Sequence, residues 1–142
     1  MTRVPMSRST AVPEDNAPDV PVLGMSKLTD VYGDWITFHD ATVESVLIER
    51  RGPAVTIVFE TCDMAFRNGE LVDQDRRARV VVRWHQVREL RIEGIDSEER
   101  NWIDGLTLIP SGEWVTSELE LMDGLHGVIV ARSIEVVDVE PR

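Results

Sequence analysis

The chain has 142 residues, of which 42% are hydrophobic and 29% charged, a composition typical of a folded protein that can bury a core. Its 26 acidic and 15 basic residues give a formal net charge of -11. This charge argues against nucleic acid as a partner, because affinity for phosphate backbones comes largely from Lys and Arg. It favours encounter with a basic protein, although simple solubility accounts for it equally well.

The single cysteine, Cys62, cannot form an intramolecular disulfide or a zinc knuckle, so we expect a reducing, cytoplasmic environment. The sequence has no apolar run of about 18 residues, and we expect no membrane partner. Residues 1–25 are rich in Pro, Ser, Asp and Ala and lack the apolar centre of a secretory signal. We interpret them as a disordered leader, or as sequence upstream of a start at Met6 or Met25. Residues 26–142 are expected to form a single β-rich domain.

The first predicted element in chain order is a short helix at residues 25–32. Its apolar side chains recur at i, i+3 and i+4, and Gly33 follows as a stop signal. Ser26 is the expected cap of the helix N-terminus. The apolar side chains are those of Leu28, Val31 and Tyr32.

From residue 42 the hydrophobic pattern changes to period two, which predicts β-strands. Strands at residues 42–50 and 55–60 form a predicted hairpin, and a third strand covers residues 77–84. Between them, Asn68-Gly69 is the favoured residue pair for a tight hairpin turn. The inward-facing side chains are expected to be Val55, Ile57, Phe59, Val80, Val82 and Trp84.

The second half of the chain continues the strand pattern with turn signals between strands. We expect a bend or bulge near His85-Gln86, followed by a helical turn at residues 96–102. A short strand is predicted at 106–109, where Pro110 ends it, and another at 115–121. After a turn at Asp123-Gly124, a final strand at 127–139 is either continuous or kinked near Ser133. Six to nine strands without a β-α-β rhythm predict a mainly β (β-rich α+β) fold. The expected architecture is an antiparallel meander, a curled sheet or a sandwich, with one short N-terminal helix.

His39-Asp40 invites an acid–base interpretation, because an imidazole beside a carboxylate can exchange protons near neutral pH. If these residues enter a strand, however, their side chains point to opposite faces of the sheet. No nucleophile motif such as GxSxG accompanies them. We therefore favour a structural role, in which both side chains satisfy backbone groups at the junction of helix and strand.

Metal and cofactor binding find little support in the sequence. His39, His85 and His126 are far apart along the chain, without HxH or HExxH spacing. The acidic group at Asp63, Asp73 and Asp75 lacks the spacing of a calcium loop. We expect neither a metal nor a cofactor.

The tryptophans and the acidic second half suggest where a protein partner binds. Trp35 and Trp84 are expected to fill the core, while Trp102 and Trp114 fit either the core or a contact surface. The predicted partner-binding residues are Glu98, Glu99, Trp102, Asp104, Glu113, Trp114, Glu118 and Glu120.

One segment resembles a known family. It reads Gly33-Asp34-Trp35-Ile36-Thr37-Phe38-His39-Asp40-Ala41-Thr42-Val43. This resembles the FGxWPSFHDAEV signature of the immunity protein 50 family, with Ile-Thr in place of the usual Pro-Ser and Thr42 where Glu is common. Residues 90–95 are similar to the family's LRFEGV strand, and further similarity extends to residue 141.

The resemblance implies a bacterial immunity protein that neutralises a cognate polymorphic toxin in the cytoplasm without catalysis. It implies occlusion of the toxin in an interface of about 1,600 Å² in total. It supplies no catalytic residues, and we regard Gly33, Trp35, Phe38, His39 and Asp40 as a structural signature. Two alternatives stay open: a small enzyme that uses His39 with Asp40, and a structural module such as a homodimer paired through an edge strand.

Overall fold

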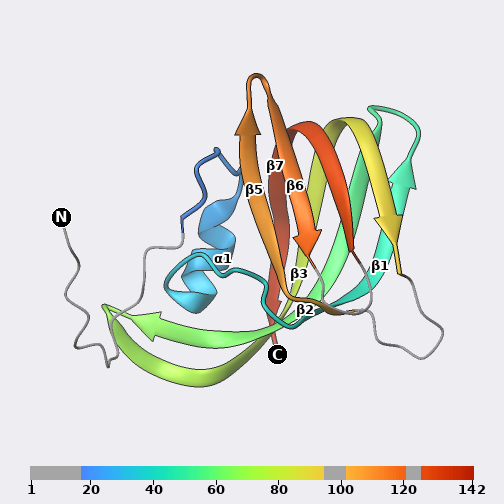
Figure 1. Ribbon diagram of the computed structural model, residues 1–142. Helices are drawn as coiled ribbons and strands as arrows, with labels where there is room; N and C mark the ends of the chain where they lie inside the picture. The colour runs from blue at the N-terminus through green and yellow to red at the C-terminus, as the bar shows by residue number, and fades with distance from the viewer. Residues whose placement is uncertain (1–16, 95–101, 121–125) are drawn as a thin grey trace.

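The computed structural model describes residues 17–94, 102–120 and 126–142. These residues form one short helix and a single seven-stranded antiparallel sheet, which confirms the predicted fold class (Figure 1). The elements are α1 (Met25–Tyr32), β1 (Ala41–Glu49), β2 (Ala54–Arg67), β3 (Glu70–Glu93), β4 (Trp102–Ile103), β5 (Gly105–Ser111), β6 (Trp114–Glu120) and β7 (His126–Pro141). The strand order is β4-β1-β2-β3-β7-β6-β5. The one helix in this part of the chain is too short to cross a membrane.

The long β2–β3 hairpin forms the centre of the sheet. Its turn is the predicted Asn68-Gly69 pair, and both residues have the positive φ that a tight hairpin turn requires. The side chains predicted to face inward are all buried, because period-two alternation places them on one face of the sheet.

The sheet curls because β3 changes partners at the predicted bulge. Gln86 has a positive φ of 54°, and the register between β3 and β7 shifts between Val87 and Glu89. Residues 70–77 of β3 pair with β2, residues 78–85 pair with both β2 and β7, and residues 87–93 pair with β7. The two ends of the sheet therefore turn toward the same side.

Helix α1 and the segment after it cover the concave face of this curled sheet. Leu28 and Tyr32 of α1 are fully buried, and the helix contacts β7 and β2. The Phe38 ring lies between Trp35, with centroids 5.8 Å apart, and Phe59, at 5.0 Å. The aromatic side chains of the resemblance segment are thus part of the core, whereas its His39 and Asp40 are exposed.

The start of α1 differs from the prediction. Ser26 is not the cap: the N-cap position is Gly24, in a left-handed conformation and without a side-chain hydrogen bond. A Cβ on Gly24 would lie 2.3 Å from the carbonyl oxygen of Val136, so only glycine fits there. The preceding residues, placed in the leader by sequence, lie against β7: Val20 is buried, and Leu23 bridges β7.

The predictions for Pro110 and Trp102 need correction, the predicted alternatives for the final strand are resolved, and two predicted turns lie wholly or partly outside the described residues. Pro110 does not end its strand but pairs with Val115 inside β5, an edge strand, where a missing N–H is tolerated. The final strand β7 is continuous. Trp102 is in β4 and not in a helical turn, while the rest of that predicted turn and Asp123-Gly124 lie outside the described residues.

Candidate functional site

The structure divides the predicted partner-binding residues between two neighbouring places. Four of them belong to β6 or the turn before it: Glu113, Trp114, Glu118 and Glu120. Trp102 and Asp104 lie at β4 and directly after it. Glu98 and Glu99 lie outside the described residues.

The predicted partner-binding residues of β6 face away from the core. Val115, Ser117 and Leu119 are buried, so the alternating positions between them face away from the core. The Trp84 indole N–H donates to Ser117 Oγ at 2.8 Å, which explains how a serine is buried on the inner face. The outer face of β6 carries Trp114, Thr116, Glu118 and Glu120.

Two arginines that the sequence analysis did not single out contact Trp114. The guanidinium carbon of Arg132 lies 4.8 Å from the indole centroid, and that of Arg88 lies 5.2 Å away. Both distances are within the range of cation–π attraction. Arg132 also forms an ion pair with Glu113, with Nη1 and Oε1 2.8 Å apart. Trp114 is thereby held, half-buried, among charged side chains.

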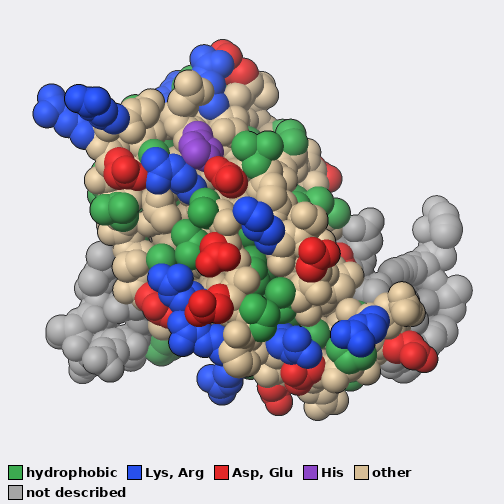
Figure 2. Space-filling model, turned by 180° about the vertical axis from the view of Figure 1, so that it is seen from behind, with side chains coloured by type: hydrophobic (Ala, Val, Ile, Leu, Met, Phe, Trp, Pro, Cys, Tyr) green, Lys and Arg blue, Asp and Glu red, His purple; other side chains and the backbone are tan. Residues whose placement is uncertain are grey.

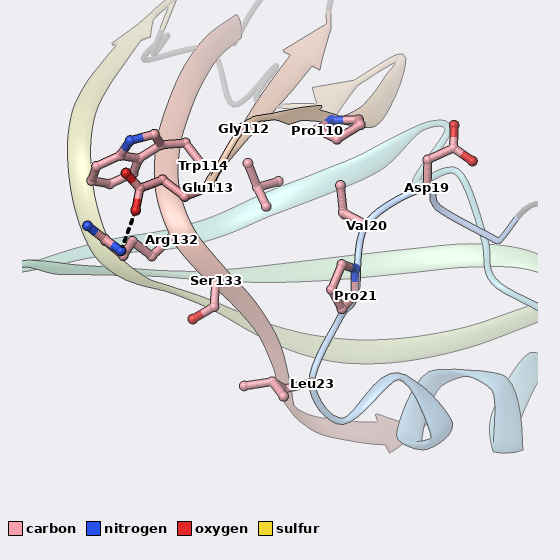
Figure 3. A pocket seen from close by; sticks show the side chains of 11 residues that line it. Asp19, Val20, Pro21, Leu23, Pro110, Gly112, Glu113, Trp114, Arg132 and Ser133 are labelled. Atoms are coloured by element: carbon pink, nitrogen blue, oxygen red, sulfur yellow. Dashed lines mark ion pairs between the residues drawn. The ribbon is translucent and has the colours of Figure 1, made fainter.

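A groove of about 310 Å³ opens beside Trp114 (Figure 3). Residues 19–23 form one wall, the β5–β6 turn forms the other, and Arg132 and Ser133 of β7 lie between them. Leu23 is 55% exposed at this groove. The groove therefore combines apolar surface with the paired charges of Glu113 and Arg132, which Figure 3 shows side by side.

His39 and Asp40 lie in a turn before β1, so their side chains do not point to opposite faces as a strand would require. Phe38 and Asp40, on either side of His39, have positive φ values of 63° and 61°. This turn brings His39 Nε2 within 3.4 Å of Asp40 Oδ2. The two side chains are 64% and 69% exposed, so water reaches both groups.

The other ring nitrogen of His39 contacts the chain after β4. Nδ1 lies 2.9 Å from the backbone carbonyl oxygen of Asp104 and donates a hydrogen bond to it. This bond and the neighbouring Asp40 carboxylate raise the pKa of His39 above its usual 6.5. The expected structural role, a bond to backbone at this junction, is thus present for the histidine.

His39, Asp40 and Asp104 also form the one cluster, within the described residues, whose composition and spacing suit a divalent cation. Their potential ligand atoms lie within 4.8 Å of one another. Sequence spacing missed this cluster because Asp104 is distant along the chain. His85 and His126 do not join it: each pairs with a different carboxylate, Glu135 or Glu93.

The C-terminal end of β6 lies next to this cluster. The Asp104 N–H donates to the carbonyl oxygen of Glu120 at 2.6 Å, and Thr107 Oγ1 donates to Glu120 Oε2 at 2.9 Å. The C-terminal end of β6 therefore lies beside the chain that holds Asp104. The acidic residues at this end of β6 and beside it are Asp40, Asp104, Glu118 and Glu120, and we call them the acidic end of β6.

Sequence comparison assigns the chain to a family. The family described as Immunity protein 50 matches residues 24–142, which includes every described element. The chain belongs to the immunity protein 50 family. This confirms the resemblance noted at residues 33–43. Members of an immunity protein family are associated with toxin neutralisation and are generally non-enzymatic.

Other comparisons add little to this immunity protein 50 assignment. No curated protein matches the chain. Among solved structures, a crystal structure of an uncharacterized protein from Neisseria gonorrhoeae shares 14% sequence identity with a TM-score of 0.45, covering 74% of this chain and 94% of that chain.

Proposed function

We propose that this immunity protein neutralises a cognate toxin by binding and occluding it, in the cytoplasm and without catalysis. The proposed contact surface is the outer face of β6 with its neighbours on β3 and β7. We call it the β6 surface. It consists of Arg88, Glu113, Trp114, Glu118, Glu120 and Arg132, with Asp40 and Asp104 at its acidic end.

The position of Trp114 carries this proposal. Tryptophan and arginine are the residue types most enriched among interface residues that dominate binding energy. Here one half-buried tryptophan lies against two arginines and beside an open groove. The ion pair and cation–π contacts hold the indole in place before binding, which lowers the entropy cost of forming an interface.

The acidic end supports a partner with basic side chains. Like the net charge of -11, these carboxylates attract a basic protein and speed its encounter, an effect that salt screens. The charge and the tryptophan have different expected roles: the carboxylates act mainly on the association rate, and Trp114 on the lifetime of the complex.

The exposure of His39 and Asp40 favours binding over catalysis. A general acid or base acts best where the site excludes water and positions a substrate. These two side chains lie on the open surface, at 64% and 69% exposure. The groove is lined by other residues. The enzyme hypothesis is therefore the weaker one.

The test is the affinity of Trp114→Ala for the proposed cognate toxin, measured by calorimetry. We expect at least a 30-fold loss, equivalent to about 2 kcal/mol, the value typical of a dominant interface residue. The matched control is Val72→Ala, which truncates a side chain that is 51% exposed on β3. An unchanged affinity of a folded Trp114→Ala variant would exclude the β6 surface, and no binding by wild-type protein would exclude the function.

A further inference from the structure

The turn before β1 is held against the chain after β4, which is distant from it in sequence. The Asp40 N–H donates to the Ile103 carbonyl oxygen at 2.9 Å. The Leu106 N–H donates to the Thr37 carbonyl oxygen, also at 2.9 Å. Asp104 lies between these two bonds along the chain. Backbone hydrogen bonds therefore fix where Asp104 lies relative to the turn.

The His39 ring is oriented by a bond that leaves its other nitrogen available to a cation. Nδ1 lies 2.9 Å from the Asp104 carbonyl oxygen, and because a carbonyl can only accept, Nδ1 carries the proton. In the neutral ring Nε2 is then an acceptor, and it lies 3.4 Å from Asp40 Oδ2, which is an acceptor as well. A cation between two such acceptors stabilises both. Histidines that bind metals typically have this arrangement, with the second ring N–H bonded to a backbone carbonyl or a carboxylate.

The spacing of the potential ligand atoms agrees with the size of a zinc site. Zn²⁺ binds imidazole nitrogen and carboxylate oxygen at about 2.0–2.2 Å, so neighbouring ligand atoms of a tetrahedral site are about 3.3–3.6 Å apart. The 3.4 Å between His39 Nε2 and Asp40 Oδ2 lies within that range. Asp104 offers a third ligand atom, and all three atoms lie within 4.8 Å of one another. Rotation of these surface side chains closes the remaining distance.

We propose that His39, Asp40 and Asp104 bind one Zn²⁺ ion, with water completing its coordination. The imidazole selects zinc and similar transition metals over Ca²⁺ and Mg²⁺, which prefer oxygen ligands. The two carboxylates balance the charge of a divalent ion. Within residues 17–94, 102–120 and 126–142, neither of them forms an ion pair with a lysine or an arginine.

Charged side chains elsewhere on the surface are arranged differently. Figure 2 shows a face on which acidic and basic side chains are intermixed, so that carboxylates there have cationic side chains nearby. The other two histidines also differ from His39, because His85 pairs with Glu135 and His126 with Glu93. Among the described residues, neither belongs to a group of three potential ligands. The three-ligand arrangement is therefore particular to the turn before β1.

A zinc ion at this place links the turn before β1 to the chain after β4. Because the three ligands come together only in the folded chain, zinc binding should raise the melting temperature. The ion also takes up two of the four carboxylates at the acidic end of β6, a consequence for toxin binding that rests on the proposed function. The zinc site itself does not rest on that function, and it is tested on this protein alone.

Calorimetric titration of the full chain with zinc chloride tests the site, at about pH 8 so that the imidazole is neutral. We expect one Zn²⁺ per chain, and binding at least tenfold weaker in His39→Ala and in Asp104→Asn. Asp40→Asn should weaken binding as well, and asparagine tolerates the positive φ of 61° at that position. The melting temperature of the wild-type protein should rise with zinc, and that of Asp104→Asn should rise less.

Two variants serve as controls for this experiment. His126→Ala removes another exposed histidine that lies 3.1 Å from a carboxylate, and Cys62→Ser removes the exposed thiol. Both should bind zinc as the wild type does. In NMR spectra of the wild-type protein, zinc should shift the ring signals of His39 and leave those of the other two histidines in place, a result that does not depend on any variant folding. Absence of zinc binding by the wild type would overturn the proposal, as would zinc affinity that His39→Ala and Asp104→Asn leave unchanged.

Discussion

The segment from Gly33 to Ala41 and the β6 surface are two regions of opposite construction. The first is one continuous stretch of chain that fills the concave face, where Trp35 and Phe38 are buried. The second gathers side chains from β3, β6 and β7 on the outside, and it shares Asp40 with the first region. The difference suggests that the buried aromatic residues of the family signature maintain the fold, while the residues proposed to bind the toxin, apart from Asp40, lie outside the signature.

The two regions should therefore respond differently to substitution. Changes in the inner segment and the core beneath it are expected to alter the free energy of unfolding. Changes on the β6 surface are expected to alter binding and leave stability nearly unchanged.

Gly33→Ala is expected to cost about 3 kcal/mol or more of unfolding free energy. Gly33 has a φ of 82°, and a Cβ there would lie 2.2 Å from the carbonyl oxygen of Phe66, so strain and collision add together. Gly69→Ala is the matched control, because its φ is 80° but nothing lies within 4 Å. That control should cost about 1–2 kcal/mol. Equal losses in urea unfolding would contradict the close contact.

Ser117→Ala is expected to cost about 1–3 kcal/mol, because it leaves the buried Trp84 indole N–H without its acceptor. The neighbouring outward residue provides a control: Thr116→Ala should change stability by less than about 0.5 kcal/mol. Chemical denaturation of the two variants measures both values. A Ser117→Ala variant as stable as Thr116→Ala would show that the inner face does not depend on this hydrogen bond.

Tyr32→Phe is expected to cost about 1 kcal/mol, through loss of the hydroxyl that contacts Thr61 Oγ1 at 2.7 Å and donates to the Arg76 carbonyl oxygen at 2.9 Å. Burial raises the pKa of Tyr32 from 10.0 to about 12. The stability that this hydroxyl contributes is therefore present below pH 10 and lost as pH rises through 12. Unfolding measured across that range should show a weaker pH dependence for the phenylalanine variant.

The smallest expected effect is at His39, whose pKa is raised by its hydrogen bond to the Asp104 carbonyl and by the Asp40 carboxylate. Because the pKa is higher in the folded state, protonation of His39 stabilises the folded protein fully below pH 6.5. This stabilisation is lost as the pH rises through the pKa of His39 in the folded state. NMR titration should give a His39 pKa above 6.5 that falls in Asp40→Asn. An unchanged pKa in that variant would mean that the two side chains do not interact in solution.

Much of the fold was predictable because it depends on local pattern. Alternation identified the inward residues of β2 and β3, the Asn68-Gly69 pair identified the turn, and Gly33 identified the end of α1. Pro110 was misinterpreted because a proline ends a central strand but is tolerated on an edge, and edge position depends on the whole sheet.

The candidate site was less predictable, since its contacts join distant parts of the chain. Trp114 was singled out from sequence, but nothing local indicated Arg88 or Arg132, which reach it through the register of β3, β7 and β6. His39 and Asp104 meet for the same reason. Side-chain alternation shows which residues face outward, but strand pairing decides which of them become neighbours.

The most direct test is the crystal structure of the complex with the proposed cognate toxin. We expect Trp114 and the carboxylates of Glu118 and Glu120 to lie in the interface, while Trp35 and Phe38 stay buried in the core as they are in the free protein. A complex in which Trp114 remains exposed to solvent, and the toxin binds another face, would contradict this expectation.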